Sequence, residues 1–545
     1  MRRATLRNSF LMAVAIVIIV VLYATLTYHF VPNDEPAVYT VTIQDKDLQA
    51  VTIEASFILQ DQILLMAPEA SSLYGQFVKN LQATDQSEQP IMVESCAMWQ
   101  IFACNLWRGW EGQSKWHVDA APGDLITIRY DIDLKHETAD FPGGTDTAAF
   151  ATEWGLFATG RSLFVMNGQP SSEFVAEILP WLDGWVAPRE DSRQQIEVNF
   201  NLPDGWKVTV PWQQSANNQR TYVARDMIDL SESMMFVGTH HEFTTQQSDT
   251  EIVWAFSGQD ILAEKEALSQ AAERFFNYYT DLMGGLPLAT QGEPFPKVVV
   301  IITEGHTDGE VIDRNIALIF DRGSDFYGLN EVMIGNQIFH LSPIHLIAHE
   351  FFHLWNGKSI DSAPEGEWFG EGLTDYNTIR VLHRFGYFDE ATCFEFLRQH
   401  YRLYTESSGY GEVSIQDAGS DKGQYRGLVY GGGMFAGLTL DLIIRHETNN
   451  QKSFDDLMRG LYADYAGTGR LFTSTEIQAR AETLSGKNLD NFFNRYIYGT
   501  KRVPVETYLP YAGLQADIND TELILSRRTT LTELEQNIHS GIFGE

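Results

Sequence analysis

The chain has 545 residues, of which 44% are hydrophobic and 12% aromatic, a composition typical of folded rather than disordered proteins. This length is too great for a single core, so two or three domains are expected. The formal net charge of −35 argues against a nucleic-acid partner, because the phosphates of the nucleic acid would be repelled.

The N-terminal residues have the pattern of a membrane anchor. Three arginines among the first seven residues precede an uncharged apolar run from Phe10 to about Tyr28. Roughly nineteen apolar residues can span a bilayer as a helix, and the basic end is expected to stay in the cytoplasm. We therefore expect residues 1–32 to form a cytoplasmic stub and a transmembrane anchor, with the catalytic part extracytoplasmic (periplasmic in a bacterium). A cleaved signal peptide is the alternative, and it leads to the same location.

Strand patterns dominate residues 33–240. Apolar and polar residues alternate from Ile126 to Leu134 and again from Ile196 to Leu202, which is the period of a half-buried strand. We interpret this region as a β-rich N-terminal domain, with a sandwich as its expected architecture.

The three cysteines do not point to cysteine chemistry. Cys96 and Cys104 are close enough in sequence to form a disulfide in an oxidising compartment, and whether they pair is left open. Cys393 lies in a helical pattern with phenylalanines and is expected to be a buried thiol. None of the three belongs to a metal-binding or nucleophile motif.

The strongest functional pattern is the run Ala348-His349-Glu350-Phe351-Phe352-His353, on an apolar segment that Ser342-Pro343 opens as an N-cap and first-turn proline. His349 and His353 are four residues apart, so both imidazoles lie on one helix face. They are separated by ~6 Å along the helix axis, within reach of one zinc ion. Glu350, beside the first histidine, is placed to act as a general base on a metal-bound water.

A second segment, Glu367–Tyr376, supplies the remaining groups of a zinc site. Glu371 follows His353 by 18 residues, enough for a loop and the start of a helix that returns to the metal. Asp375 comes one turn later, where its carboxylate can accept the free N–H of a ligating histidine and fix the ring. Two histidines, a glutamate, an open fourth position and an adjacent base are typical of catalytic zinc rather than structural zinc.

His345 lies one turn before His349 and competes as a ligand. A His345/His349 pair would lack a glutamate beside its first histidine and would misplace Glu371. We therefore interpret His345 as a packing residue or a hydrogen-bond partner of a ligand, and predict His349, His353 and Glu371 as the metal ligands.

These motifs resemble those of the glycyl aminopeptidase family of gluzincin metallopeptidases, metallopeptidase family sixty-one. Two later blocks extend the resemblance: Tyr430-Gly431-Gly432-Gly433 with Asp441-Leu442 and Ile444-Arg445, and Asn491–Tyr496 with Gly499-Thr500 and Pro504. The first block is similar to the family's Tyr-x-Lys-Gly…Asp-Leu-x-Ile-Arg pattern, with Gly432 in place of the lysine. The similarity extends from about residue 200 to residue 512.

The resemblance implies an α+β multidomain protein, in which the β-rich domain precedes a thermolysin-like catalytic domain over 241–385 and a helical lobe over 386–512. It also implies one zinc ion per chain and a peptide substrate held along an edge strand at Asn315–Phe320. Tyr430 is implied as the donor that stabilises the oxyanion. A PDZ domain commonly follows in the family, but residues 513–545 are too few for one and are expected to be a C-terminal tail.

One segment departs from the family pattern. The resemblance leads us to expect Gly-Gly-x-Glu-His before the edge strand, where the glutamate binds the free α-amine of a substrate. With the chain aligned on Arg314-Asn315, the expected Glu-His pair becomes Ile312-Asp313. Glu310 or Asp313 could still supply a carboxylate for the amine, and a solvated acidic loop is the alternative.

The sequence thus predicts a membrane-anchored, extracytoplasmic zinc metallopeptidase, foremost an aminopeptidase. An endopeptidase with altered N-terminus recognition is the second hypothesis, because the amine-binding motif is changed. A non-catalytic peptide-binding or scaffold protein is the third, and the presence of every zinc ligand and of the base argues against it.

Overall fold

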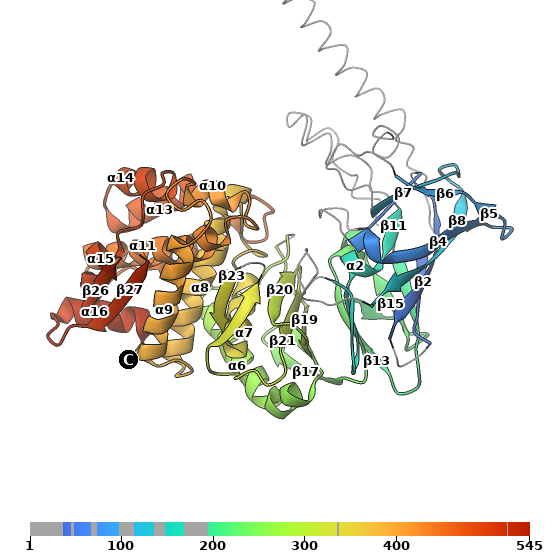
Figure 1. Cartoon of the computed structure of the whole chain (residues 1–545), viewed down its shortest axis with the longest axis horizontal. Coiled ribbons are helices and arrows are strands. Elements are labelled where there is room, and N and C mark those ends of the chain that lie inside the picture. The colour runs from blue at the N-terminus through green and yellow to red at the C-terminus, as the bar shows by residue number, and fades with distance from the viewer. Residues whose placement is uncertain are drawn as a thin grey trace, which may run out of the picture. The chain divides into compact units, whose positions relative to one another are not determined.

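The computed structural model describes residues 36–44, 48–60, 62–66, 74–96, 114–135, 148–167, 195–290, 292–334, 337–519 and 521–544. The chain divides into two compact units, Met1–His240 and His241–Glu545 (Figure 1). This boundary coincides with the start expected for the catalytic domain. The predicted anchor in residues 1–32 and Cys104 lie outside the described residues, and the finer boundaries at 385/386 and 512/513 remain predictions.

The first unit is built from β-sheets. The largest has the strand order β14 (Gln213–Gln214), β15 (Thr221–Ala224), β12 (Ile196–Asn201), β1 (Ala37–Thr42), β2 (Ala50–Ile58), β8 (Leu125–Asp133), β4 (Val78–Asp85) and β5 (Pro90–Ile91). A second has the order β13 (Lys207–Thr209), β16 (Met234–Gly238), β10 (Gly155–Thr159) and β9 (Phe150–Thr152). A third has the order β11 (Val165–Asn167), β3 (Ile63–Met66), β7 (Lys115–Val118) and β6 (Val93–Ser95). Short helices α2 (Gly160–Leu163) and α5 (Met227–Ser231) connect strands, and the prediction of a β-rich N-terminal domain is confirmed.

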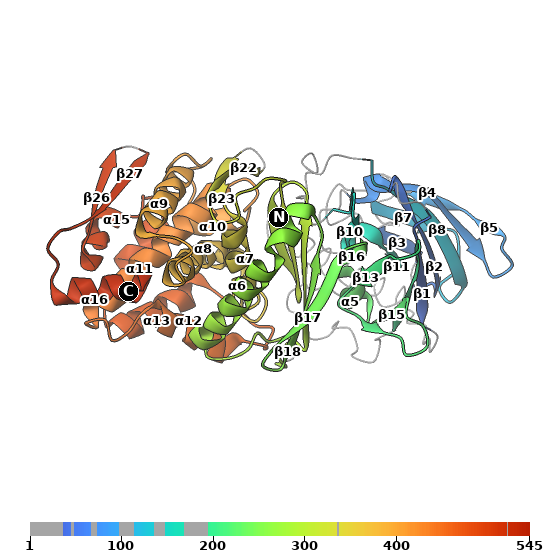
Figure 2. The same ribbon diagram turned by 90° about the horizontal axis from the view of Figure 1, so that it is seen from below.

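Alternation along the strands creates the buried face of the large sheet. Alternate residues of β8 are at most 1% exposed: Ile126, Ile128, Tyr130 and Ile132. The hydroxyl of Tyr130 donates to Leu163 O at 3.0 Å, and that of Tyr39 donates to Val165 O at 3.1 Å. These bonds hold the buried face against the chain that enters β11, and Figure 2 shows β3, β7 and β11 beside β1, β2 and β8.

The second unit contains a five-stranded sheet in the order β17 (His241–Gln247), β18 (Thr250–Phe256), β19 (Lys297–Glu304), β21 (Asn315–Phe320) and β20 (Asp308–Ile312). Strands β18, β19 and β21 run parallel, whereas β17 and β20 are antiparallel to their neighbours. The continuous apolar run of β19 predicts its central position, because parallel strands are buried on both faces. Helices α6 (Gln259–Met283) and α7 (Pro343–His353) pack together, and Tyr279 OH donates to Ala348 O at 3.0 Å.

The edge strands of this sheet are β17 and β20, so the expectation that Asn315–Phe320 is the edge strand is wrong. That segment forms β21, which lies between β19 and β20. The physical reason is a tight hairpin: Ile312 pairs with Asn315, and the intervening Asp313 has a φ of 49°, the left-handed conformation that two-residue turns use. The acidic stretch is therefore a strand and a turn rather than a solvated loop.

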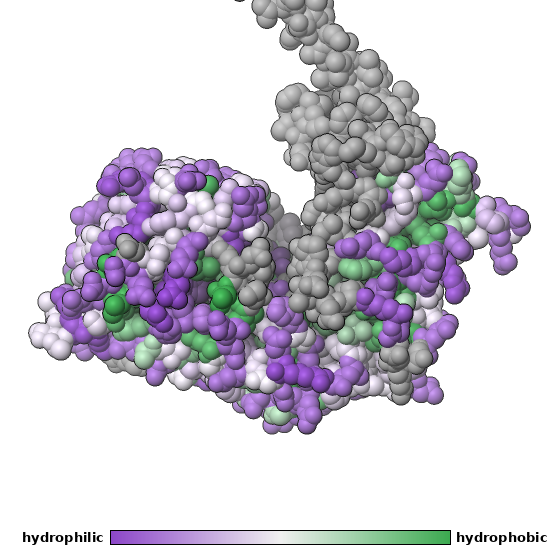
Figure 3. All heavy atoms as spheres, in the orientation of Figure 1, coloured by the Kyte–Doolittle hydropathy of each residue, from purple (hydrophilic) through white to green (hydrophobic). Residues whose placement is uncertain are grey.

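Helices form most of the remainder of the second unit: α8 (Glu367–Arg384), α9 (Glu390–Thr405), α10 (Ile415–Gly419), the π-helical turn η9 (Leu428–Gly432), α11 (Gly433–Glu447), α12 (Phe454–Tyr465), α13 (Ser474–Ser485), α14 (Asp490–Phe492), the π-helical turn η10 (Phe493–Ile497) and α15 (Val505–Tyr508). Two-stranded pairs join β22 (Asn330–Ile334) to β23 (Gln337–Leu341) and β24 (Asp361–Ser362) to β25 (Leu471–Phe472). The prediction that this part of the chain is helical is confirmed. Figure 3 shows mostly hydrophilic residues on the visible surface of these helices, and their buried apolar residues belong to the core of the second unit.

The expected C-terminal tail is instead folded onto the helices. It forms a hairpin of β26 (Leu514–Asn519) and β27 (Glu522–Arg527), followed by α16 (Glu533–Phe543). His539 Nε2 lies 3.0 Å from Glu390 Oε1 at the start of α9. Buried apolar residues mark one face of α16: Ile538, Ile542 and Phe543. This helical spacing is the signal in the sequence that identifies the segment as structured.

One apolar helical run belongs to the core of the second unit. Within the described part of the chain, one helical run, Leu428–Glu447, is long and apolar enough to cross a membrane. Its most apolar window is 94% buried inside the protein. A Cβ atom at Gly433 would collide with Trp368 O of α8, so glycine permits the close approach of α8 and α11.

Candidate active site

The zinc-binding pattern lies on α7, whose start follows the sequence signals. Ser342 Oγ accepts a hydrogen bond from the backbone N–H of His345 at 3.2 Å, and Pro343 occupies the first turn. His349 and Glu350 are each 5% exposed, and His353 ends the helix. The helix is therefore capped at one end and presents its polar side chains within an otherwise apolar interior.

Three predicted ligand atoms converge on one point. His349 Nε2 and His353 Nε2 lie 3.0 Å apart, and Glu371 Oε2 from α8 lies 3.4 Å from the first and 3.3 Å from the second. Tetrahedral coordination at zinc–ligand distances of about 2.0–2.1 Å places neighbouring ligand atoms about 3.3 Å apart. Glu371 Oε2 is buried and has no hydrogen-bond partner in the described part of the chain. The two facing nitrogens and the unpartnered carboxylate oxygen fit zinc.

The other ring nitrogen of each histidine is hydrogen bonded to an acceptor. His349 Nδ1 lies 2.9 Å from Asp375 Oδ1, and His353 Nδ1 lies 2.9 Å from the carbonyl oxygen of Asn356. Each Nδ1 therefore carries the proton, and each Nε2 presents its lone pair towards the metal position. Asp375 thus lies where the sequence predicts it.

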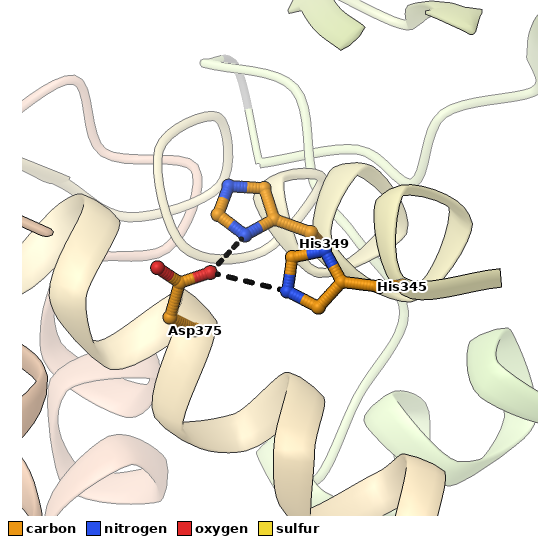
Figure 4. A group of neighbouring side chains, drawn as sticks. All are labelled: His345, His349 and Asp375. Atoms are coloured by element: carbon orange, nitrogen blue, oxygen red, sulfur yellow. Dashed lines mark hydrogen bonds and ion pairs between the residues drawn. The ribbon is translucent and has the colours of Figure 1, made fainter. Parts of the chain in front are cut away.

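Asp375 also contacts two further histidines. His345 Nε2 lies 3.4 Å from Asp375 Oδ1, and Figure 4 shows His345 and His349 directed at this same carboxylate. His400 of α9 approaches from another side, with Nε2 3.0 Å from Asp375 Oδ2. Burial acts to raise the pKa of Asp375, but His400 and His349 hold it well below its usual range. Sequence reasoning missed His400, although its place beside Phe396 on the buried face of α9 is a usable signal.

Glu350 lies against the edge strand. A Cβ atom built at Gly309 of β20 would lie 2.8 Å from Glu350 Oε1. Burial raises the pKa of Glu350 to about 7, opposed by His349 and His353 and reinforced by the carboxylate of Glu310. The structure therefore brings Glu310 to the site. It does not bring Asp313, which lies in the hairpin turn with its Oδ2 3.0 Å from Arg314 Nη1.

Tyr430 reaches the site from the π-helical turn η9, a type of distortion that is frequent at functional sites. Its ring stacks on that of His349 with centroids 6.3 Å apart, and Phe339 of β23 packs edge-on at 6.2 Å. Arg426, one turn earlier, has its Cζ atom 5.3 Å from the Tyr430 ring centroid. Burial raises the pKa of Tyr430 well above its ordinary value, so the phenol retains its proton and can donate it in a hydrogen bond.

Lys422 is the second residue of the site that the sequence does not reveal. Its Nζ atom lies 2.6 Å from Glu371 Oε1, the oxygen that faces away from the histidines. Lys422 is 51 residues from Glu371 and lies in a turn, so neither periodicity nor motif spacing connects the two.

Comparisons with known proteins agree with this geometry. Residues 342–455 match the family model of the M61 glycyl aminopeptidases. An aminopeptidase N family protein from Idiomarina loihiensis has a similar structure, with a TM-score of 0.66 and 14% identity over 88% of this chain and 79% of that one. An M1 zinc metallopeptidase from Deinococcus radiodurans has a TM-score of 0.51 and 11% identity over 86% of this chain and 94% of that one. No curated protein sequence matches the chain.

The structural similarities, at these identities, show the fold: a multidomain α+β architecture shared with aminopeptidases. The family match shows more, because it covers both histidines, Glu350, Glu371 and Tyr430. The resemblance to the glycyl aminopeptidase family is therefore confirmed over residues 342–455, and the chain is a zinc-dependent metallopeptidase of the aminopeptidase type.

Proposed function

We propose that the protein is a membrane-anchored, extracytoplasmic aminopeptidase that holds one zinc ion at His349, His353 and Glu371 and removes N-terminal residues from peptides. The observation that carries the proposal is the convergence of three ligand atoms at 3.0–3.4 Å, with both histidine Nδ1 atoms tied to acceptors. The apolar run before about Tyr28 supports the anchor and the location.

The chain's own residues divide the work of hydrolysis. Zinc bound at the three ligands would polarise the scissile carbonyl and lower the pKa of a water. The Glu350 carboxylate accepts a proton from the attacking water and later delivers it to the leaving amine. The hydroxyl of Tyr430 donates a hydrogen bond to the oxyanion, which lowers the barrier by roughly 3–4 kcal/mol.

Glu310 supplies recognition of the N-terminus. It lies on the edge strand β20, close enough to Glu350 to contribute to the raised pKa of that base. A peptide that pairs with the edge of β20 would place its α-ammonium near this carboxylate and its first peptide bond near Glu350. Asp313 is the neighbouring carboxylate, but it forms an ion pair with Arg314 in the turn and is not expected to bind the amine. It therefore serves as the control for Glu310.

The test uses the part of the chain from about Asn33, loaded with zinc, beside its Glu350→Gln variant. Matched peptides with free or acetylated N-termini are incubated with each protein, and the products are identified by mass. We expect stepwise loss of N-terminal residues from free peptides only, and retained zinc with nearly all turnover lost in Glu350→Gln. Substantial turnover in that variant would remove Glu350 from its role.

Two further variants separate the remaining functions. Glu310→Gln is expected to raise KM for free peptides, whereas Asp313→Asn leaves it unchanged. Internal cuts that are indifferent to acetylation would establish the endopeptidase, which the replacement of Glu-His by Ile312-Asp313 favours. No cleavage of any peptide by a zinc-loaded protein would favour the peptide-binding or scaffold role.

A further inference from the structure

The two carboxylate oxygens of Glu371 have different surroundings. Oε2 is buried, has no hydrogen-bond partner in the described part of the chain, and faces the two histidine Nε2 atoms. Oε1 accepts a charge-assisted hydrogen bond of 2.6 Å from Lys422 Nζ. The ammonium therefore occupies the oxygen that a second carboxylate–metal bond would need.

Lys422 is itself held by a second carboxylate. Its Nζ lies 3.4 Å from Glu367 Oε2, one turn before Glu371 on α8. An ammonium bound to two carboxylates on one helix face has little freedom to leave Oε1.

We propose that Lys422 is a positioning residue that restricts Glu371 to single-oxygen coordination, and so keeps the fourth zinc position open for water or substrate. This inference rests on the proposed function of the site. A carboxylate free to turn can bind a metal through both oxygens, and the second bond would raise the ligand number from four to five and crowd the position at which water or substrate binds. Sharing the negative charge of Glu371 with an ammonium also leaves the zinc a stronger Lewis acid.

The experiment compares the full-length protein with Lys422→Met, which keeps most of the aliphatic stem, and Lys422→Arg, which keeps a cation. Cobalt(II) replaces zinc, because its visible absorption is intense with four ligands and weaker with five. Zinc affinity is measured separately by chelator competition. Lys452→Met is the matched control, since Lys452 contacts Asp456 at 3.4 Å in a partly exposed pair of the same unit.

We expect Lys422→Met to weaken the cobalt absorption, to raise zinc affinity through the second carboxylate–metal bond, and to lower kcat more than it raises KM. Lys422→Arg and the control should retain the wild-type spectrum. An unchanged spectrum and unchanged zinc affinity in Lys422→Met would overturn the inference. Lys422→Gln, which keeps a neutral donor and should give an intermediate spectrum, provides the test if the methionine variant does not fold.

The outcomes distinguish this inference from the proposed function. A four-ligand spectrum that changes in Lys422→Met, in a wild-type protein that cleaves no peptide, would support the role of Lys422 and contradict the peptidase assignment. Peptide cleavage by the wild-type protein, with no spectral change in Lys422→Met, would support the peptidase assignment and contradict the role of Lys422.

Discussion

A methyl group at Gly309 would lie 2.8 Å from Oε1 of Glu350, closer than a Cβ atom approaches an oxygen in folded proteins. The edge strand and the proposed base are therefore in contact, and the absence of a side chain at Gly309 is what permits it. A peptide paired with this strand, as proposed above, would have its backbone beside Glu350. It also gives the edge strand a role in positioning the base.

Gly309→Ala should consequently lower kcat/KM about 10- to 100-fold, because a displacement of the base by a fraction of an ångström misaligns proton transfer. Zinc content should not change, since no ligand moves. Gly370→Ala is the control: the nearest atom to its added methyl would be 3.9 Å away, so activity should be retained. Equal activity of both variants would show that the backbone accommodates the methyl group and that the contact does not hold Glu350.

Tyr430→Phe should lower kcat about 100- to 1,000-fold with little change in KM, because the hydroxyl acts on charge that develops only in the transition state. A transition-state analogue with a tetrahedral oxyanion should lose affinity in proportion, whereas a product amino acid should not. Tyr410→Phe is a suitable control in the same unit, since that ring packs on Tyr404 away from the ligands. A change in KM alone would assign Tyr430 to substrate binding instead.

The residues that the sequence predicts well are those whose relation is local or repeats a family motif. His349 and His353 are related by one helical turn, and the capping of α7 by Ser342 follows from the adjacent residues. Glu371 and Asp375 sit one turn apart on α8, and both reach His349. These relations are set by helix geometry, which spacing alone encodes.

Relations between distant segments are not encoded in this way. The expectation of an edge strand at Asn315–Phe320 is wrong because a two-residue turn adds β20 outside it, and this turn lies in a stretch that the family pattern does not match. Lys422 and His400 reach Glu371 and Asp375 only through the packing of α9 and η9 against α8. Such contacts depend on the whole arrangement of helices, not on any local period.

Removal of the buried carboxylate at Asp441 should destabilise the second unit. Its oxygens accept from Tyr376 OH at 2.5 Å, Arg445 Nε at 2.9 Å and the backbone N–H of Phe454 at 2.8 Å. Asp441→Ala leaves Arg445 buried without this partner, which typically costs about 3–5 kcal/mol in the free energy of unfolding. Urea denaturation of the variant and the wild-type protein would measure this change in the free energy of unfolding.

The control is Glu406→Ala, which removes a solvent-exposed partner 3.8 Å from Arg402 and should change stability by less than about 1 kcal/mol. Because Tyr376 neighbours Asp375 on α8, the Asp441 variant should also bind zinc more weakly. Similar denaturation midpoints for the two variants would mean that the buried network contributes no more than a surface pair.

Zinc binding to the metal-free protein should release protons near neutral pH. Burial acts to lower the pKa of His349, but Asp375 and Glu371 outweigh it and raise the pKa well above its ordinary value. Burial also acts to lower the pKa of His353, but Glu371 outweighs it and raises this pKa above its ordinary value. The two Nε2 atoms lie 3.0 Å apart, a hydrogen-bond distance, so the raised pKa values favour one extra proton held between the two rings, and this proton must leave before both nitrogens can bind zinc.

The sign of the pH dependence follows from these raised pKa values. Zinc affinity should rise with pH by about 10-fold per pH unit while this proton is held, with the release of about one proton per zinc ion. Titration of zinc into weakly buffered metal-free protein measures the release directly. Asp375→Asn removes the carboxylate that most raises the pKa of His349, so it should release fewer protons and show a shallower pH dependence. An affinity that does not vary between pH 6 and 8 would mean that both imidazoles are already neutral before the metal arrives, and the carboxylates would then not control their protonation.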